Sequence, residues 1–277
     1  MYSLGSGDAE VIVDGHTYEA LGGDWAIVDH DRLEHLISDR QYTFDVRAWC
    51  VAPFGDDPLV GTANARLFIG SQPVTSFDAI PTRDEWYTPW GAPPDVRSLT
   101  TGPDGVVLVN VHVGGVWRSA DALDGPWEEV VAVDDDSHQV LAHPAGVVIA
   151  AAVGFGWSVD GGRTFSWTTD GLHASYCRAV AVAGDTVLVS ASTGPRTNRG
   201  AVYRRDLVSS APFERCADGL PEWFEFNVNT FQLAASGADV ALGTDDGRVY
   251  VSADAGGSWS LAAEGLPPIH CLAFAGS

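Results

Sequence analysis

The chain has 277 residues, 45% of them hydrophobic, which is enough to bury a large core in one repeat-built domain or two ordinary ones. Its 37 acidic residues outnumber 15 basic ones and give a formal net charge of -22. General binding to nucleic acid is therefore disfavoured, because a phosphate backbone requires a basic surface.

All of the basic residues are Arg, and Lys is absent. This composition resembles that of proteins from salt-in halophiles such as haloarchaea, in which salt shortens the range of repulsion between acids. The alternative is an ordinary acidic protein of a high-GC organism. The chain does not begin with a basic segment followed by an apolar run, and no apolar run is long enough to cross a bilayer. We therefore expect a cytoplasmic protein with no membrane span.

Strand patterns begin near the N-terminus. Short apolar stretches at residues 10–13, 16–20 and 25–28 predict three strands, whereas the segment 29–44 is long and partly helix-like. From there on, β-branched runs bounded by Gly and Asp predict further short strands. The clearest of these runs lie at residues 46–51, 96–99, 106–111, 115–119, 147–150, 177–182, 186–189, 200–203, 239–242, 247–250 and 269–274.

Two eight-residue segments share one pattern. Residues 158–165 read SVDGGRTF and residues 252–259 read SADAGGSW. An Asp side chain can accept hydrogen bonds from N–H groups further along a turn, and glycine readily adopts positive φ. The pattern therefore predicts two structural hairpin turns, remote from any pocket. The residues that define them are Ser158, Asp160, Gly162, Thr164 and Phe165 in the first turn, and Ser252, Asp254, Gly256, Ser258 and Trp259 in the second.

Both segments resemble the Asp-box, or BNR, repeat of sialidase-like β-propellers. An aromatic anchor recurs at intervals of 38 to 52 residues, near the roughly 40–50 residues of a propeller blade. The anchors are Trp25, Phe77, Trp127, Phe165, Phe213 and Trp259.

The resemblance implies an all-β, six-bladed β-propeller that forms a single domain over residues 1–277. The last blade is expected to join both chain ends, which removes exposed strand edges. Five or seven blades stay open as alternatives because of the segment 29–44. The expected blades lie at about residues 45–80, 95–130, 137–168, 176–216 and 228–262, with 268–277 plus 8–29 as the sixth.

The opening strands of the repeats suggest a binding site. Aligning them places Arg47, Arg97 and Arg178 at one repeat position, with His138 and His270 at the corresponding places. In a propeller these strands surround the axis, and guanidinium groups bind carboxylate or phosphate bidentately. The sequence thus predicts a central anion-binding pocket. The equally weighted alternative is that each Arg pairs with a neighbouring acid and only holds blades together.

Aromatic residues in the connections are further candidates for contact with a ligand or partner, with loop packing as the alternative. They are Trp86, Tyr87, Trp90, Tyr176 and Trp223. His112 and His143 are expected to be structural. The four cysteines lie too far apart for a zinc motif, and no phosphate-binding loop or HExxH pattern is present, so no metal and no cofactor are expected.

Sialidases use three arginines, a Tyr–Glu nucleophile pair and an acidic Asp. This chain lacks the Arg-Ile-Pro segment of that family, and no Tyr–Glu pair can be assigned. We therefore expect a non-enzymatic scaffold, similar to the assembly-factor branch of Asp-box propellers, that binds a protein partner or a small anionic ligand at its loop-rich face. The alternative is a sialidase-like glycoside hydrolase or lyase with two catalytic carboxylates. Their candidates are Asp45, Asp95, Asp134, Asp135, Asp136, Glu222 and Glu225.

Overall fold

The computed structural model describes residues 2–4, 9–11, 17–102, 105–121 and 123–274. Strands dominate these residues, and none of the described helices is long and apolar enough to cross a bilayer. The chain divides into two compact units. Unit 2 comprises His16–Ile149 and Gly156–Ser166, and unit 1 comprises Met1–Gly15, Ala150–Phe155 and Trp167–Ser277.

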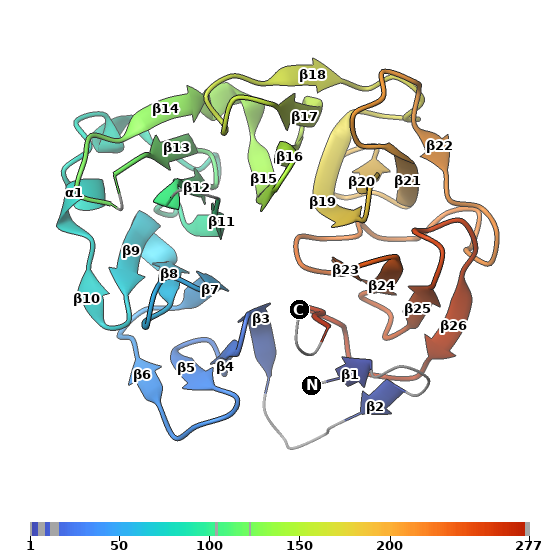
Figure 1. Cartoon of the computed structure of the whole chain (residues 1–277), viewed down its shortest axis with the longest axis horizontal. Helices are drawn as coiled ribbons and strands as arrows, with labels where there is room; N and C mark the ends of the chain where they lie inside the picture. The colour runs from blue at the N-terminus through green and yellow to red at the C-terminus, as the bar shows by residue number, and fades with distance from the viewer. Residues whose placement is uncertain (1, 5–8, 12–16, 103–104, 122, 275–277) are drawn as a thin grey trace. The chain divides into compact units, whose positions relative to one another are not determined.

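Six four-stranded sheets follow one another along the described chain, and in each sheet every strand lies beside the next in sequence (Figure 1). Six successive meanders of this kind are the blades of a six-bladed β-propeller, so the predicted fold class is confirmed. The strands are β3 (Tyr18–Gly22), β4 (Trp25–Val28), β5 (Arg32–His35) and β6 (Gln41–Thr43); β7 (Ala48–Ala52), β8 (Leu59–Thr62), β9 (Arg66–Ile69) and β10 (Gln72–Pro73); β11 (Val96–Thr101), β12 (Val107–Val111), β13 (Gly115–Ser119) and β14 (Glu128–Val131); β15 (Ser137–His143), β16 (Gly146–Ala151), β17 (Gly154–Ser158) and β18 (Ser166–Thr168); β19 (Tyr176–Ala183), β20 (Thr186–Ser192), β21 (Ala201–Asp206) and β22 (Glu214–Arg215); and β23 (Leu233–Ser236), β24 (Asp239–Gly243), β25 (Val249–Ser252) and β26 (Ser260–Ala263).

Smaller elements complete the described chain. A separate two-stranded sheet pairs β1 (Tyr2–Leu4) with β2 (Ala9–Val11). The short helices are α1 (Thr75–Asp78) and the 3-10 turns η1 (Ala63–Ala65), η2 (Arg83–Glu85) and η4 (Val133–Asp135).

Burial falls from the inner to the outer strands of a sheet, which explains the sequence pattern. Every residue of β12 and β13 is buried, so these strands read as continuous apolar runs rather than as alternating ones. The fourth strand of the same sheet, β14, exposes Glu128 and Glu129. The core of this blade therefore lies around its second and third strands, and its outer strand carries exposed acidic residues.

The N-terminal blade differs from the expected one. Strands β3 to β6 form a complete sheet from one continuous segment, and the C-terminal residues that the structure describes, up to residue 274, supply none of its strands. The expectation of a blade shared between the two chain ends is therefore wrong. The segment 29–44, interpreted as partly helix-like, contains the strands β5 and β6. Residues 12–16 and 275–277, which the predicted shared blade included, lie outside the described residues.

The C-terminal segment packs instead against the sheet β23–β26. The backbone N–H of Ile269 donates to the carbonyl of Thr244 at 3.1 Å, and that of Leu272 donates to the carbonyl of Phe231 at 2.9 Å. Ile269 and Leu272 are buried in a cluster with residues of β24 and β25. A methyl group on Gly243 would collide with the Ile269 side chain, so glycine permits this close contact. Burial of apolar side chains fixes the segment without strand pairing.

The two eight-residue turns have the same internal hydrogen bonds. In the first turn, Thr164 donates its N–H to Asp160 at 3.0 Å and its hydroxyl to the other carboxylate oxygen at 2.7 Å. The equivalent bonds from Ser258 to Asp254 measure 2.9 and 2.8 Å. Each turn also directs a glycine N–H to a serine hydroxyl at 2.9 Å. These bonds hold the pKa of both carboxyl groups well below the usual range, chiefly through the backbone N–H groups.

The aromatic anchors are equivalent in four sheets only. Trp127, Phe165, Phe213 and Trp259 each directly precede the fourth strand of a sheet. Trp25 instead begins the second strand of its sheet, and Phe77 lies in α1. The spacing of 52 residues between Trp25 and Phe77 therefore joins two positions that are not equivalent.

Candidate functional site

A bulge recurs in the first strand of four sheets. The register shifts between Tyr18 and Ala20, Ala48 and Cys50, Val96 and Ser98, and Cys177 and Val180. A bulge re-aims a side chain and is frequent beside functional sites. The residues at the shift include Glu19 in β3, Trp49 in β7, Arg97 in β11 and Arg178 in β19. Arg97 and Arg178 are thus equivalent, as predicted, whereas Arg47 lies two residues ahead of the equivalent Trp49.

In unit 2, Arg47 forms an ion pair. Its guanidinium donates to the carboxylate of Glu19 at 2.7 Å, and the side chain of Glu19 is only 7% exposed. The other oxygen of that carboxylate lies 2.6 Å from the Nδ1 atom of His30. The Arg47 guanidinium carbon also lies 3.9 Å from the ring centre of Trp49. Arg47 therefore fits the alternative in which each arginine pairs with an acid and holds blades together. Its acid, Glu19, belongs to the preceding sheet.

Arg97 lies on the same aromatic ring, with its guanidinium carbon 5.5 Å from the centre of Trp49. Burial raises the pKa of Asp95, while the charge of Arg97 and a hydrogen bond from the Asn64 backbone oppose this shift. Two arginines, an indole and a half-buried carboxyl group are therefore packed together. Their arrangement resembles a structural ion network more than an open anion site.

In unit 1, Arg178 lines a pocket of about 230 Å³. Its guanidinium donates to the amide oxygen of Asn229 at 2.5 Å and to the hydroxyl of Tyr176 at 3.2 Å, and both partners are neutral. Within the described part of the chain, its buried Nε–H has no hydrogen-bond acceptor. The other lining residues are Pro195, Arg196, Thr197, Glu225, Phe226, Asn227 and Asp245.

Asn227 holds the wall of this pocket in place. Its amide donates to the carbonyls of Gly194 and Pro195 at 3.2 and 3.1 Å, and its oxygen accepts from Ser192 at 2.5 Å. Gly200, at the end of the same loop, forms a β-bridge with Phe224. The polar loop 192–200 is therefore fixed at both ends, and it presents Arg196 to solvent at the rim.

Trp223 belongs to a second cluster of unit 1. Its ring lies between the guanidinium carbons of Arg199 and Arg215, at 4.5 and 4.3 Å, and beside the ring of His173 at 4.7 Å. Burial lowers the pKa of His173, and the two arginine charges add to this effect. His173 also bonds the hydroxyl of Tyr203 at 2.8 Å. Cation–π packing of this kind orders the loops that flank the Arg178 pocket.

The remaining predicted aromatics divide between core and surface. Trp86 is 7% exposed and packs against Phe77 and Trp117, so it is a core residue. Tyr87 and Trp90 are 53% and 61% exposed. His270, predicted to complete the ring, is exposed in the C-terminal segment of unit 1. His138 is almost fully buried in unit 2.

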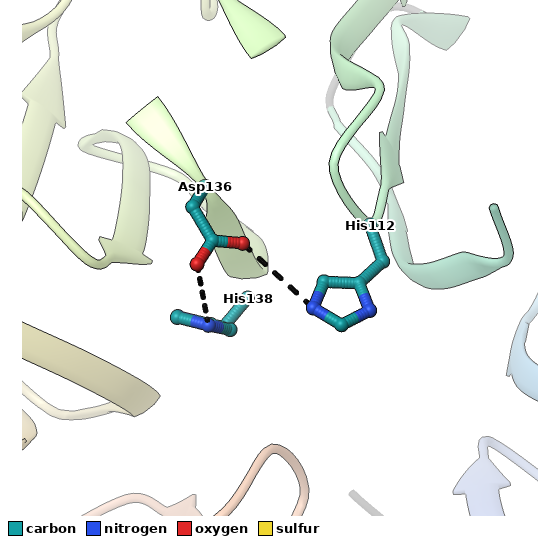
Figure 2. Close-up of side chains that lie close together, drawn as sticks. All are labelled: His112, Asp136 and His138. Atoms are coloured by element: carbon teal, nitrogen blue, oxygen red, sulfur yellow. Dashed lines mark ion pairs between the residues drawn. The ribbon is translucent and has the colours of Figure 1, made fainter. Parts of the chain in front are cut away.

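His138 lies instead beside two residues for which the sequence analysis predicted no shared site. Its Nε2 atom is 3.6 Å from one oxygen of Asp136, and the Nε2 atom of His112 is 3.7 Å from the other. Figure 2 shows the two imidazoles on either side of the carboxylate. One ligand atom from each residue lies within 4.8 Å of the others. His112 follows β12, and Asp136 and His138 lie at the start of β15.

A second pocket lies in unit 2. Its volume is about 500 Å³, and it adjoins the first eight-residue turn. Asp160, Gly161 and Arg163 help to line it, so the expectation that this turn is remote from any pocket is wrong. Arg118 contributes from β13 and donates its Nε–H to the carbonyl of Gly161 at 2.8 Å. Burial and the charge of Arg163 lower the pKa of Arg118.

No protein-family model matches the sequence, and no curated protein matches it either. Among solved structures, the WD40 repeats of RRP9 are 13% identical with a TM-score of 0.65, over 95% of this chain and 86% of that one. YCF48 bound to D1 peptide is 14% identical with a TM-score of 0.57, over 89% of this chain and 82% of that one. An ancestral GH74 enzyme is 13% identical with a TM-score of 0.60 over 83% of this chain, which spans only 35% of that enzyme. At these identities the likeness shows the fold alone, and the fold is that of β-propeller proteins.

Proposed function

We propose that the protein is a non-enzymatic binding module and that the pocket around Arg178 accepts a carboxylate side chain of a protein partner. The observation that carries the proposal is the state of Arg178, whose guanidinium is half-buried, is held by neutral groups, and keeps one N–H without an acceptor among the described residues. An incoming carboxylate would give this guanidinium the charged acceptor that its neutral partners do not provide.

The size and charge of the pocket favour a side chain of a partner over a separate small ligand. Ligand pockets for small molecules usually measure about 300–1,000 Å³, and this one measures about 230 Å³. Glu225 and Asp245 line the pocket together with Arg178 and Arg196. The two negative charges repel a multiply charged phosphate ligand more strongly than a single carboxylate.

Two comparisons support a peptide-binding role. The WD40 structure shares the fold over most of both chains, and the YCF48 structure contains a bound peptide of D1. Propellers host many activities, and these two structures support the proposal by analogy of fold. No catalytic arrangement in the described residues favours the glycoside hydrolase alternative, and the likeness to the GH74 enzyme concerns the fold alone.

We also infer that residues 158–165 and 252–259 are Asp-box repeats and that the acid-rich, Lys-free surface is an adaptation to high salt. The matching hydrogen bonds of Asp160 and Asp254 support the first inference. The net charge of -22 supports the second. Cys50 and Cys216 are buried free thiols, which is typical of a reducing compartment such as the cytoplasm.

Random peptides displayed on phage and selected on the protein test the proposal directly. We expect the selected peptides to share an Asp or Glu. Fluorescence anisotropy should show binding at least about tenfold weaker to Arg178→Gln, which corresponds to about 1.4 kcal/mol. The exposed Arg163→Gln, in unit 2, is the matched control and should bind as the parent does. Equal affinity of Arg178→Gln and the parent for an acidic peptide, or selection of peptides without an acid, would overturn the proposal.

A further inference from the structure

We propose that His112, Asp136 and His138 bind one divalent transition-metal ion of the Zn²⁺ class. The site lies in unit 2 and is independent of the Arg178 pocket. Two imidazoles and one carboxylate are a donor set that suits Zn²⁺ and its first-row neighbours, whereas Ca²⁺ and Mg²⁺ prefer oxygen ligands alone. The inference replaces the expectation that the chain holds no metal.

The distances fit a metal better than they fit hydrogen bonds. Around a tetrahedral Zn²⁺ with bonds of about 2.0–2.1 Å, neighbouring ligand atoms lie about 3.3 Å apart. The two imidazole-to-carboxylate distances are 3.6 and 3.7 Å. These values exceed the usual 2.7–3.2 Å range of an N–H···O hydrogen bond. The two distances run to different oxygens of Asp136, so a rotation of its carboxylate that brings one oxygen toward both imidazoles would complete the metal geometry.

Buried polar contacts fix the two strands that carry the histidines. Asn110, in β12, is fully buried and donates to the carbonyl of Ser137 in β15 at 3.0 Å and to the hydroxyl of Ser98 at 3.3 Å. Ser98 in turn accepts the backbone N–H of Val140 at 3.0 Å. These contacts hold the start of β15 against β12, so the three donor groups are arranged before any ion binds.

Asp136 reaches the histidines through an uncommon backbone conformation. It ends η4 with φ of 46°, in the left-handed region, and its N–H bonds the carbonyl of Val133 at 3.2 Å. Asp tolerates this region better than most residues do. The left-handed turn reverses the chain within the Asp134–Asp136 run, so that the last carboxylate meets His138 two residues later. Figure 2 shows the carboxylate pointing between the two rings.

The site leaves room for one further ligand. Three protein donors leave the fourth tetrahedral position of the ion to water or to a group of a bound molecule, as in catalytic zinc sites. The His112 and His138 side chains are 11% and 2% exposed, whereas that of Asp136 is 31% exposed. Trp90, itself 61% exposed, lies 5.3 Å from the His112 ring. Access is therefore from the side of Asp136 and Trp90.

Calorimetry with Zn²⁺ on the full chain, freed of metal by a chelator, tests the proposal. Excess Mg²⁺ in the buffer occupies the many surface carboxylates, which would otherwise bind Zn²⁺ weakly. We expect one Zn²⁺ per chain and a rise in the thermal unfolding midpoint on binding. Co²⁺, used as a second probe, should give the visible absorption of a four-coordinate ion. Zn²⁺ affinity should fall as the pH is lowered, because the imidazoles must be neutral to bind.

Matched variants distinguish Zn²⁺ binding at this site from weak Zn²⁺ binding by the other carboxylates of the protein. Asp136→Asn preserves a side chain that tolerates the left-handed region, and Asp135→Asn is its neighbouring control. His138→Asn is paired with His143→Asn in the same strand. We expect Asp136→Asn and His138→Asn to bind Zn²⁺ at least about tenfold more weakly and to lose the Co²⁺ spectrum, with both controls unchanged.

Either of two results overturns the proposal. One is a parent protein that binds no stoichiometric Zn²⁺ in excess Mg²⁺. The other is equal loss of Zn²⁺ affinity in Asp135→Asn and Asp136→Asn, which would attribute binding to the acidic run as a whole. Circular dichroism of each variant verifies the fold, and Asp136→Asn decides the question if His138→Asn does not fold.

Discussion

Arg47 donates to the carboxylate of Glu19 across 2.7 Å, and the two residues lie in neighbouring stretches of unit 2 that the sequence separates by 28 positions. In this pair, one of the three arginines predicted to bind an anion is engaged by a carboxylate of the protein itself. The carboxylate is nearly buried and its other oxygen lies 2.6 Å from His30, so the guanidinium supplies the positive charge that a buried carboxylate requires. Arg47 therefore stabilises the fold through Glu19.

Arg47→Ala should lower the free energy of unfolding by about 1–2 kcal/mol. Removing one member of a buried ion pair costs about 3–5 kcal/mol, and the 38% exposure of the Arg47 side chain reduces this figure. Urea unfolding measures the loss. The double variant Arg47→Ala/Glu19→Gln should recover part of it, and additive losses in the double variant would contradict the pairing.

Asp160→Ala should lower the free energy of unfolding by about 1–3 kcal/mol, because a carboxylate that accepts four turn hydrogen bonds is lost. Asp254→Ala should have a similar effect. Asp39→Ala, at an exposed position, serves as the control and should change stability little. Thermal and urea melts compare the three. A neutral result for both turn variants would show that the turns hold without their carboxylates.

The stability contributed by Asp160 should depend on pH. Its pKa is lower in the folded protein than the value of about 3.9 in an unfolded chain. A depressed folded pKa stabilises the protein above pH of about 4, and this contribution is lost as the pH falls further. The stability gap between the parent and Asp160→Asn should therefore be wide near pH 6, begin to shrink below pH of about 4, and be smaller near about pH 3. A constant gap in urea melts over this range would contradict the shift.

Molar KCl should raise the thermal unfolding midpoint. A net charge of -22 places many carboxylates on the surface, and salt screens their repulsion. Melts in low and in molar KCl measure the effect, with a neutral osmolyte at matched osmolality as the control for excluded volume. An unchanged or lower midpoint in KCl would rule out the halophilic interpretation of the composition.

One thiol per native chain should react rapidly with Ellman's reagent. Burial raises the pKa of Cys177 and that of Cys216 to about 12 and raises the pKa of Cys50 still further, so these three thiols stay protonated and shielded. Cys271 is only half-buried. The Cys271→Ser variant should abolish the fast phase, and the other three thiols should react after denaturation. A fast phase of more than one thiol in the parent would contradict the buried assignment.

The sequence by itself was sufficient for the all-β class, the six blades and the two eight-residue turns. These features depend on residues that are close in the chain. Examples are the apolar runs that form β12 and β24, and the hydrogen bond that Thr164 donates to Asp160. The same reasoning failed for the segment 29–44. There, the strands β5 and β6 are only four and three residues long and carry too few apolar residues to show a strand period.

Only the tertiary structure decided which predicted site residues act together. Repeat alignment treated Arg47, Arg97 and Arg178 as equivalent, but the bulged position of β7 is held by Trp49, and Arg47 lies two residues before it. The position of a bulge is set by pairing with the neighbouring strand, which sequence spacing alone does not give.

The metal site illustrates the same limit. His112 and His138 are brought together by the Asn110–Ser137 hydrogen bond between two strands, and the left-handed turn at Asp136 aims the carboxylate at both. The sequence shows two scattered histidines and an acidic run that is ordinary in so acidic a chain. Strand pairing and the positive φ of Asp136 bring the three side chains into one cluster. Such clustering is set by long-range packing and not by local propensity.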